Sequence, residues 1–309
     1  MSGLRDALGV YLAVRRALGY KLDRAGRLLA QFVEHCEKAG AQTVTIELAL
    51  SWATLPAGGD RAWAAQRLSV VRGFAKHLAM VDPATQIPPA DLLPGGSHRA
   101  TPYLYSDDEV ARLLAAARAL RSPLRAATLE TLVGLLWVSG LRVGEALRLD
   151  RDDVNLTQGL LTVRDSKFGK SREVCVHPST AATLAGYSKR RDEVCPPAPD
   201  QAAFFISLSG TRLRYDNFHL AFQRLVRAAG LTPRSPKCRP RPHDLRHSFA
   251  VRTLLGWYRE GADVGARLPL LSTYLGHIHP ANTYWYLSAA PELLGLAADR
   301  LQATFGSRP

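Results

Sequence analysis

The N-terminal part of the chain carries apolar side chains at helical spacing. Leucine, phenylalanine and valine recur three or four positions apart in four stretches, and glycine or proline separates them. Gly19 and Gly40 are placed to end the first and second helices, and Thr45 is placed to cap the third. This pattern predicts an all-helical unit with helices at about 4–18, 28–40, 45–55 and 61–80.

The composition changes after this unit. Prolines and glycines gather between positions 81 and 101 and suppress regular structure, so we expect a linker at 86–100. Ser106 and Glu109 then form a capping box ahead of an apolar helix. The sequence therefore predicts a helical domain over 1–85 and a second domain over 101–309.

The second domain mixes helical periodicity with short β-prone runs. A long apolar helix over 123–139 should be buried and should end at Gly140. Two runs, 160–164 and 173–176, flank the lysine-rich turn 167–170 and read as a hairpin. The other expected elements are a helix at 178–193, a strand at 203–207, a helix capped by Asp216 and ending at Ala229, a helix that starts at Pro242, and a terminal helix at 291–305. The predicted fold class is mainly α with a small antiparallel β-sheet.

Charge points to an anionic partner. The chain is 47% hydrophobic, enough for a sizeable core, yet 40 Lys and Arg outnumber 27 Asp and Glu, a net charge of +13. Residues 1–98 contribute +3 (11 − 8) and residues 99–309 contribute +10 (29 − 19). The span 212–241 holds eight basic residues and one acid, and is a candidate surface for a nucleic-acid backbone. A merely solvated basic surface is the alternative.

Candidate phosphate contacts come from both domains. They are Arg15, Arg16, Lys21, Arg67 and Arg72 in the first domain, and Lys170, Arg172, Arg212, Arg214, Arg239 and Arg241 in the second.

The composition disfavours a disulfide-rich, a zinc-ribbon or a membrane protein. The four cysteines lack C-x-x-C spacing, which argues against a disulfide framework or a zinc ribbon. No window is apolar enough to span a membrane, so we expect a soluble cytoplasmic protein.

The stretch from His243 to Tyr286 concentrates candidate chemistry. His243, Arg246 and His247 fall at i, i+3 and i+4 and share one helix face. In a purely structural interpretation, Arg246 would pair with Asp244 or Glu260. In another, the two histidines would bind zinc together with His277 or His279. A permanent charge at Arg246 among the ligands of a dication argues against zinc.

Phosphate chemistry accounts for more of these residues. Displacement at a phosphodiester needs cations on the non-bridging oxygens and a proton for the leaving oxygen. Arg142 and Arg246 can supply the clamp, because their forked donors match phosphate. A tyrosine needs help from a base or from nearby cations to become a nucleophile, which His243 and His277 can give. A lysine from the hairpin turn can act as the acid.

These residues resemble the motifs of the tyrosine recombinases, the phage-integrase and Xer-like enzymes. The resemblance covers roughly 106–294. It rests on Ser139-Gly140-Leu141-Arg142-Val143-Gly144-Glu145, Ser166-Lys167-Phe168-Gly169-Lys170-Ser171-Arg172, His243-Asp244-Leu245-Arg246-His247-Ser248-Phe249-Ala250, and Leu275-Gly276-His277 followed nine positions later by Tyr286. The family's fold, a helical SAM-like core-binding domain and a mixed α/β catalytic domain that form a C-shaped DNA clamp, is implied here too.

The resemblance also implies an activity. Tyr286 would attack a DNA phosphate and form a 3′-phosphotyrosyl link, without a metal, a cofactor or ATP. Arg142, Arg246 and His277 would hold the phosphate, His243 would assist proton transfer, and Lys167 would protonate the leaving oxygen. The partner would be double-stranded DNA at specific sites, bound by a homo- or hetero-tetramer associated with the nucleoid. Integration, excision or transposition of mobile DNA would be the outcome.

Four points stay open. The connection from Arg246 to His277 spans 31 positions (277 − 246), longer than in compact family members. Tyr284 is a rival nucleophile, although on a helix it points away from Tyr286. Lys170 is the alternative to Lys167. A DNA-binding protein of the same fold that does not cleave is the alternative function.

Overall fold

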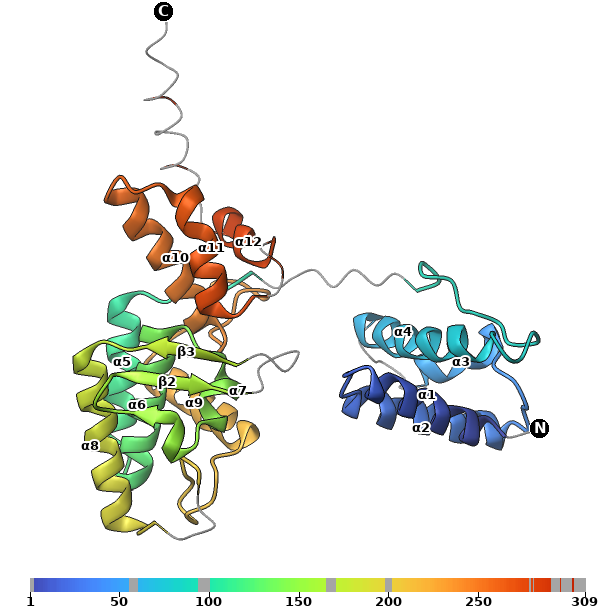
Figure 1. Ribbon diagram of the computed structural model, residues 1–309, viewed down its shortest axis with the longest axis horizontal. Coiled ribbons are helices and arrows are strands. Elements are labelled where there is room, and N and C mark those ends of the chain that lie inside the picture. Colours follow the sequence, from blue (N-terminus) through green and yellow to red (C-terminus); the bar gives the residue numbers. More distant parts are fainter. Residues whose placement is uncertain are drawn as a thin grey trace, which may run out of the picture. The chain divides into compact units, whose positions relative to one another are not determined.

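The computed structural model describes residues 3–55, 61–93, 101–164, 171–197, 202–277, 279 and 281–289, together with positions 295 and 302. The chain divides into two compact units, residues 1–99 and 100–309 (Figure 1). Lys167, Lys170, the predicted turn between them, and nearly all of the predicted terminal helix 291–305 lie outside the described residues. None of the described helices is long and apolar enough to cross a membrane.

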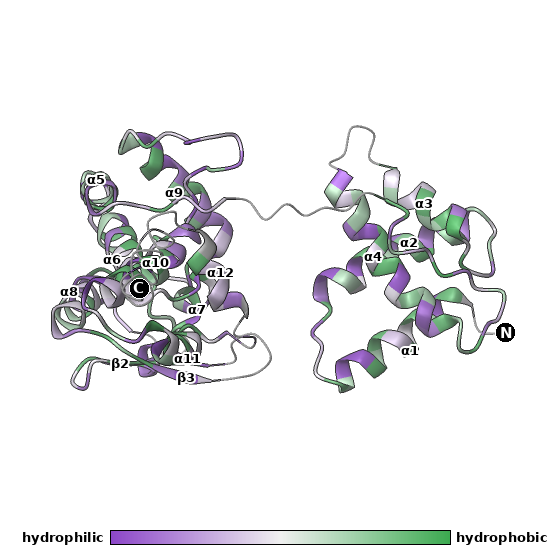
Figure 2. Ribbon diagram, turned by 90° about the horizontal axis from the view of Figure 1, so that it is seen from above, coloured by the Kyte–Doolittle hydropathy of each residue, from purple (hydrophilic) through white to green (hydrophobic). Residues whose placement is uncertain are grey.

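The first unit is helical, as predicted. Its helices are α1 (Leu4–Ala17), α2 (Asp23–Lys38), α3 (Ile46–Thr54) and α4 (Arg61–Leu78). Gly19 and Gly40 follow α1 and α2 with positive φ, and the Thr45 hydroxyl caps α3 by accepting from the Leu48 N–H at 3.2 Å. Each helix carries both hydrophobic and hydrophilic positions (Figure 2). The apolar side chains form one core around Leu29, Phe32 and Phe74.

The second unit combines helices with one small sheet. In chain order its elements are α5 (Asp107–Arg118), α6 (Pro123–Ser139), α7 (Val143–Arg148), the 3-10 turn η1 (Arg151–Asp153), β1 (Val154–Asn155), β2 (Leu160–Val163), β3 (Arg172–Cys175), α8 (Pro178–Val194), α9 (Tyr215–Ala228), α10 (Asp244–Arg259), α11 (Val264–Leu275) and α12 (Ala281–Ala289). The sheet is antiparallel in the order β1-β2-β3, and Val163 pairs with Arg172. The predicted class, mainly α with a small antiparallel sheet, is confirmed.

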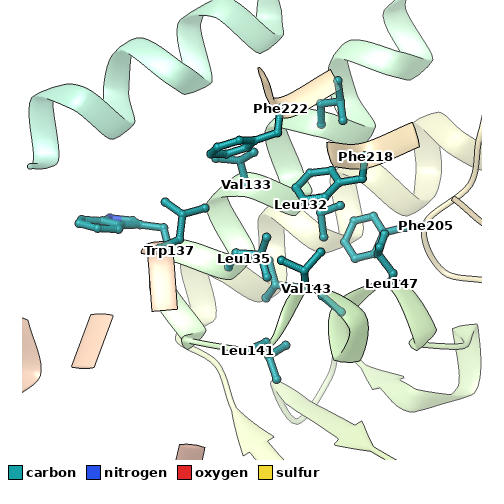
Figure 3. Close-up of a cluster of buried hydrophobic side chains, with 14 of the residues drawn as sticks. Leu132, Val133, Leu135, Trp137, Leu141, Val143, Leu147, Phe205, Phe218 and Phe222 are labelled. Atoms are coloured by element: carbon teal, nitrogen blue, oxygen red, sulfur yellow. The ribbon is translucent and has the colours of Figure 1, made fainter. Parts of the chain in front are cut away.

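Helix α6 lies at the centre of the larger core. Ser106 and Glu109 form the expected capping box on α5, which packs against α6. Side chains of α6 such as Leu132 and Val133 pack with Phe218 and Phe222 of α9 (Figure 3). Gly140 ends α6 with φ 61°, a left-handed conformation that favours glycine. A separate, smaller cluster joins α10, α11 and α12 and includes Tyr286.

Three local predictions were wrong. The segment 203–207 is not a strand, because two of its residues form single bridges to different partners, Ala203 to Asp150 and Ile206 to Arg212. Asp216 does not cap α9. It lies in the first turn of the helix, and Arg214 occupies the cap position. The helix expected from Pro242 begins at Asp244, two residues later.

Candidate active site

Arg246 joins the carboxyl ends of two helices. Its Nη1 donates to the Gly140 carbonyl at 2.8 Å, at the end of α6, and its Nη2 donates to the Leu275 carbonyl at 2.6 Å, at the end of α11. The negative ends of the two helix dipoles thus face one guanidinium. Arg246 is only 2% exposed, and burial, with the nearby charge of Arg142, lowers its pKa to about 10. It stays protonated at neutral pH.

Arg142 reaches the same end of α11. From the cap position of α7, its Nη2 donates to the Gly276 carbonyl at 3.0 Å and its Nη1 donates to Glu145 at 2.6 Å. The two arginines therefore meet at the turn that precedes His277. The pairing of Arg246 with Asp244 or Glu260, considered above, does not occur. Asp244 instead accepts from Arg241 at 2.9 and 3.0 Å.

Glu145 is a buried carboxylate that forms ion pairs with two of the arginines. Its side chain is 2% exposed and accepts from Arg142 and, with both oxygens, from Arg172 at 3.2 and 2.9 Å. Burial alone would raise the pKa of this carboxyl, but the hydrogen bonds and charge of Arg172 and Arg142 lower it to about 2. Glu145 is thus ionised and fully engaged. No role was predicted for Glu145 from the sequence, although its place three residues after Arg142 was a usable signal.

Tyr286 stands against two histidine rings. Its ring stacks on His277 at 6.0 Å and 22°, and lies 5.5 Å from the His247 ring. The His277 Nδ1 is in turn hydrogen-bonded to the Thr283 hydroxyl at 2.7 Å. Tyr286 is 2% exposed, whereas Tyr284 is 53% exposed. The helix α12 therefore presents Tyr286, and not Tyr284, to the histidines.

His243 and His247 are brought together at the start of α10. Their rings lie edge to face at 4.7 Å. His247 is buried, and its ring also contacts Trp285 at 5.4 Å, whereas His243 is exposed. His247 thus forms a bridge of ring contacts between His243 and Tyr286. Arg142, Arg246, His277 and Tyr286 converge on one place at the junction of α6, α10, α11 and α12.

Comparison with known proteins gives this geometry a family. Residues 104–292, more than half of the chain, match the model of the phage integrase family. The chain belongs to this family of tyrosine recombinases.

Two relatives match most or all of the chain. A Sinorhizobium fredii protein named as an integrase/recombinase, y4rB, is 44% identical over 313 residues, which covers 100% of each chain. The tyrosine recombinase XerC of Azotobacter vinelandii is 28% identical over 285 residues, 88% of this chain and 86% of XerC.

Solved structures of low identity share the fold. XerH recombinase bound to a palindromic difH substrate has a TM-score of 0.65 at 20% identity, over 96% of this chain and 84% of that one. The Tn1549 transposon integrase with transposon right-end DNA has a TM-score of 0.67 at 15% identity, over 96% and 98%.

Several predicted DNA contacts of this recombinase have partners within the chain. Arg67 is buried against the Trp52 ring at 3.9 Å, so it does not lie on an open surface. Arg72 donates to two main-chain carbonyls, of Pro88 and Pro89. Arg212 binds Asp150, and Arg241 and Arg172 are held by carboxylates as described above. Intramolecular pairs thus account for these five positions.

The remaining candidates are more open. Arg16, Lys21, Arg214 and Arg239 are exposed, and Arg15 is half-buried, 3.9 Å from the Tyr20 ring.

In the part of the chain that the structure describes, no three His, Cys, Asp or Glu side chains are grouped to hold a metal ion. His243 and His247 share a helix face, as expected, but His277 is oriented by Thr283.

Proposed function

We propose that this protein is a site-specific recombinase that cleaves and rejoins DNA through a 3′-phosphotyrosyl intermediate, in the integration, excision or transposition of mobile DNA. The observation that carries the proposal is the convergence of a buried tyrosine, Tyr286, with two histidine rings and two arginines fixed at helix ends. A protein that only binds DNA needs no such group.

The charge of the site suits a phosphate in its transition state. Arg142, Arg172 and Arg246 carry three positive charges and Glu145 one negative charge, a net of +2 (3 − 1) around the end of α11. Carbonyls and a carboxylate take up some of their donors, which fixes the guanidinium planes before the substrate arrives. The remaining donors of Arg142 and Arg246 would bind the non-bridging oxygens of the scissile phosphate.

The cleavage step conserves atoms and charge. The Tyr286 oxygen attacks phosphorus, a new oxygen–phosphorus bond forms, and the bond from phosphorus to the 5′ oxygen breaks. The tyrosine proton passes to a histidine, His243 in this proposal, and Lys167 gives a proton to the 5′ oxygen. A 5′ hydroxyl of another strand then reverses the step. Because the phosphotyrosyl bond keeps the energy of the original bond, rejoining needs no ATP. The arginines neutralise the phosphate, so the proposed step uses no metal ion.

The assembly follows by analogy with the neighbours. The structures similar in fold include lambda integrase as a tetramer bound to a Holliday junction. We infer that this chain also acts as a tetramer on two paired sites of double-stranded DNA, at the nucleoid in the cytoplasm. A catalytically silent DNA-binding protein is the competing function, and only an assay of covalent chemistry separates the two.

The test is a suicide substrate. A duplex selected from random sequence for binding to the full chain is nicked next to each candidate phosphate, so that the released 5′ fragment diffuses away and the adduct accumulates. With chelator present, wild type and the matched control Tyr284→Phe should give a denaturant-resistant protein–DNA adduct, and Tyr286→Phe should give none. An adduct from Tyr286→Phe would refute the nucleophile, and no adduct from wild type at any position would support the silent binder.

A further inference from the structure

Arg172 connects parts of the site that are far apart in the sequence. It is the first residue of β3, and its side chain is 14% exposed. Its Nε donates to the Tyr274 carbonyl in the last turn of α11 at 2.9 Å, and its two terminal nitrogens bind Glu145. The partners lie 102 and 27 positions away along the chain. One guanidinium thereby ties the sheet to α7 and α11.

The close approach to α11 depends on Gly276. A Cβ at this position would lie 2.8 Å from the Arg172 Nη1, nearer than real Cβ contacts allow, and its φ of 67° also favours glycine. The same glycine offers its carbonyl to Arg142 at 3.0 Å. Gly276 therefore lets Arg172 pack directly against the turn that Arg142 binds.

Four donors fill the oxygens of Glu145. Oε1 accepts from Arg142 Nη1 at 2.6 Å and from Arg172 Nη1 at 3.2 Å, and Oε2 accepts from the Arg142 N–H and from Arg172 Nη2, each at 2.9 Å. A carboxylate has about four acceptor sites. Because Glu145 is buried, losing Arg172 would leave two of these sites empty beside Arg142, the nearest remaining cation.

We propose that Arg172 is a positioning residue: it occupies Glu145 from the sheet side and so leaves the outer donors of Arg142 free for the phosphate. Without it, Glu145 draws Arg142 into a two-pronged ion pair, and the net charge of the site falls from +2 to +1. The loss falls on neutralisation of the phosphate and not on DNA binding. This inference rests on the proposed function, because it concerns the same cleavage step.

The proposal is tested with a substrate that lacks the negative charge of the scissile phosphate, which the arginines neutralise. In a methylphosphonate substrate, a methyl group replaces one non-bridging oxygen, so the reacting group is neutral and needs less positive charge. Adduct formation by Arg172→Ala should fall on the order of 10²-fold on the phosphate substrate, the scale for losing one oriented donor. On the methylphosphonate it should return to within roughly 10-fold of wild type. Arg172→Lys keeps the positive charge but not the forked pair of donors, so its rate on the phosphate substrate should lie between the rates of wild type and Arg172→Ala.

Two further variants separate positioning from folding. Adding Glu145→Gln to Arg172→Ala restores the net charge and removes the competing carboxylate, so the double variant should cleave phosphate faster than Arg172→Ala. Arg191→Ala is the control for a general loss of packing. Arg191 is 1% exposed and binds the Phe204 carbonyl at 2.8 Å, outside the site. Circular dichroism gives the folded fraction of each variant. The rate of adduct formation by Arg191→Ala, corrected for that fraction, should fall by the same factor on both substrates.

The outcomes are distinct. Equal loss on both substrates for Arg172→Ala, or a double variant slower than the single one, would make Arg172 a purely structural residue and overturn the proposal. Wild-type rates for Arg172→Ala on phosphate would overturn it as well. If wild type forms no adduct on either substrate, the proposed function itself fails, and this inference fails with it.

Discussion

Replacing Glu145 by glutamine should make the stability of the recombinase less sensitive to acid. Glutamine keeps the shape of the side chain but removes the charge that Arg142 and Arg172 bind. The folded pKa of Glu145 is about 2, and that of a glutamate in an unfolded chain is about 4.3. At about 1.4 kcal/mol per pKa unit, ionised Glu145 stabilises the fold by about 3 kcal/mol. Water screens these ion pairs little, because the Glu145 side chain is 2% exposed.

The pH dependence follows from the depressed pKa. The stabilisation is fully present above the unfolded pKa of about 4.3 and is lost as the pH falls towards the folded value of about 2. Urea unfolding of wild type and Glu145→Gln, followed by circular dichroism at several pH values, isolates this side chain because the two proteins differ nowhere else. Wild type should be more stable by about 3 kcal/mol at pH 7 and by roughly half of that at pH 3. A difference that stays constant with pH would refute the assigned ion pairs.

Three other substitutions test separate parts of the account. Gly140→Ala should lower the melting temperature, because the new Cβ would lie 2.5 Å from the Phe249 ring and the left-handed backbone alone costs about 1–2 kcal/mol. An unchanged melting temperature would contradict the close packing at this cap. Thr45→Ala should cost the first unit about 1 kcal/mol in urea unfolding through its lost cap, and a cost near zero would contradict it. Arg246→Lys, which cannot bridge the two carbonyls, should slow adduct formation on the order of 10²-fold while gel-shift binding persists, and loss of binding would point to misfolding.

Local signals made much of the fold predictable from the sequence. The capping box at Ser106, the caps at Thr45 and Gly140 and the apolar run of α6 each depend on residues within a few positions of one another, so the pattern alone located these helices. The order of the motifs likewise pointed to Arg142, Arg246, His277 and Tyr286, which the fold brings together. The segment 203–207 is apolar, which favoured a strand, but Ala203 and Ile206 form single bridges to different partners, Asp150 and Arg212, and Phe204 and Phe205 are buried in the core.

The missed features depend on tertiary contacts. Nothing near Arg172 in the sequence indicates that it meets Glu145 and Tyr274, so an arginine beside a lysine-rich turn read as a DNA contact. The burial of Arg67 could not be predicted for a similar reason, since the Trp52 ring that covers it comes from another helix. A basic residue in such a chain reads as surface charge unless its partners are known, and only the fold supplies them.

The proposed covalent attachment of Tyr286 to DNA can be located directly by mass spectrometry. The adduct is trapped on a nicked duplex, digested with nuclease and trypsin, and fragmented. The tryptic peptide 268–300 contains Tyr274, Tyr284 and Tyr286. We expect a nucleotide phosphate on Tyr286 alone. A phosphate on Tyr284 or Tyr274, or an adduct that maps to another peptide, would contradict it.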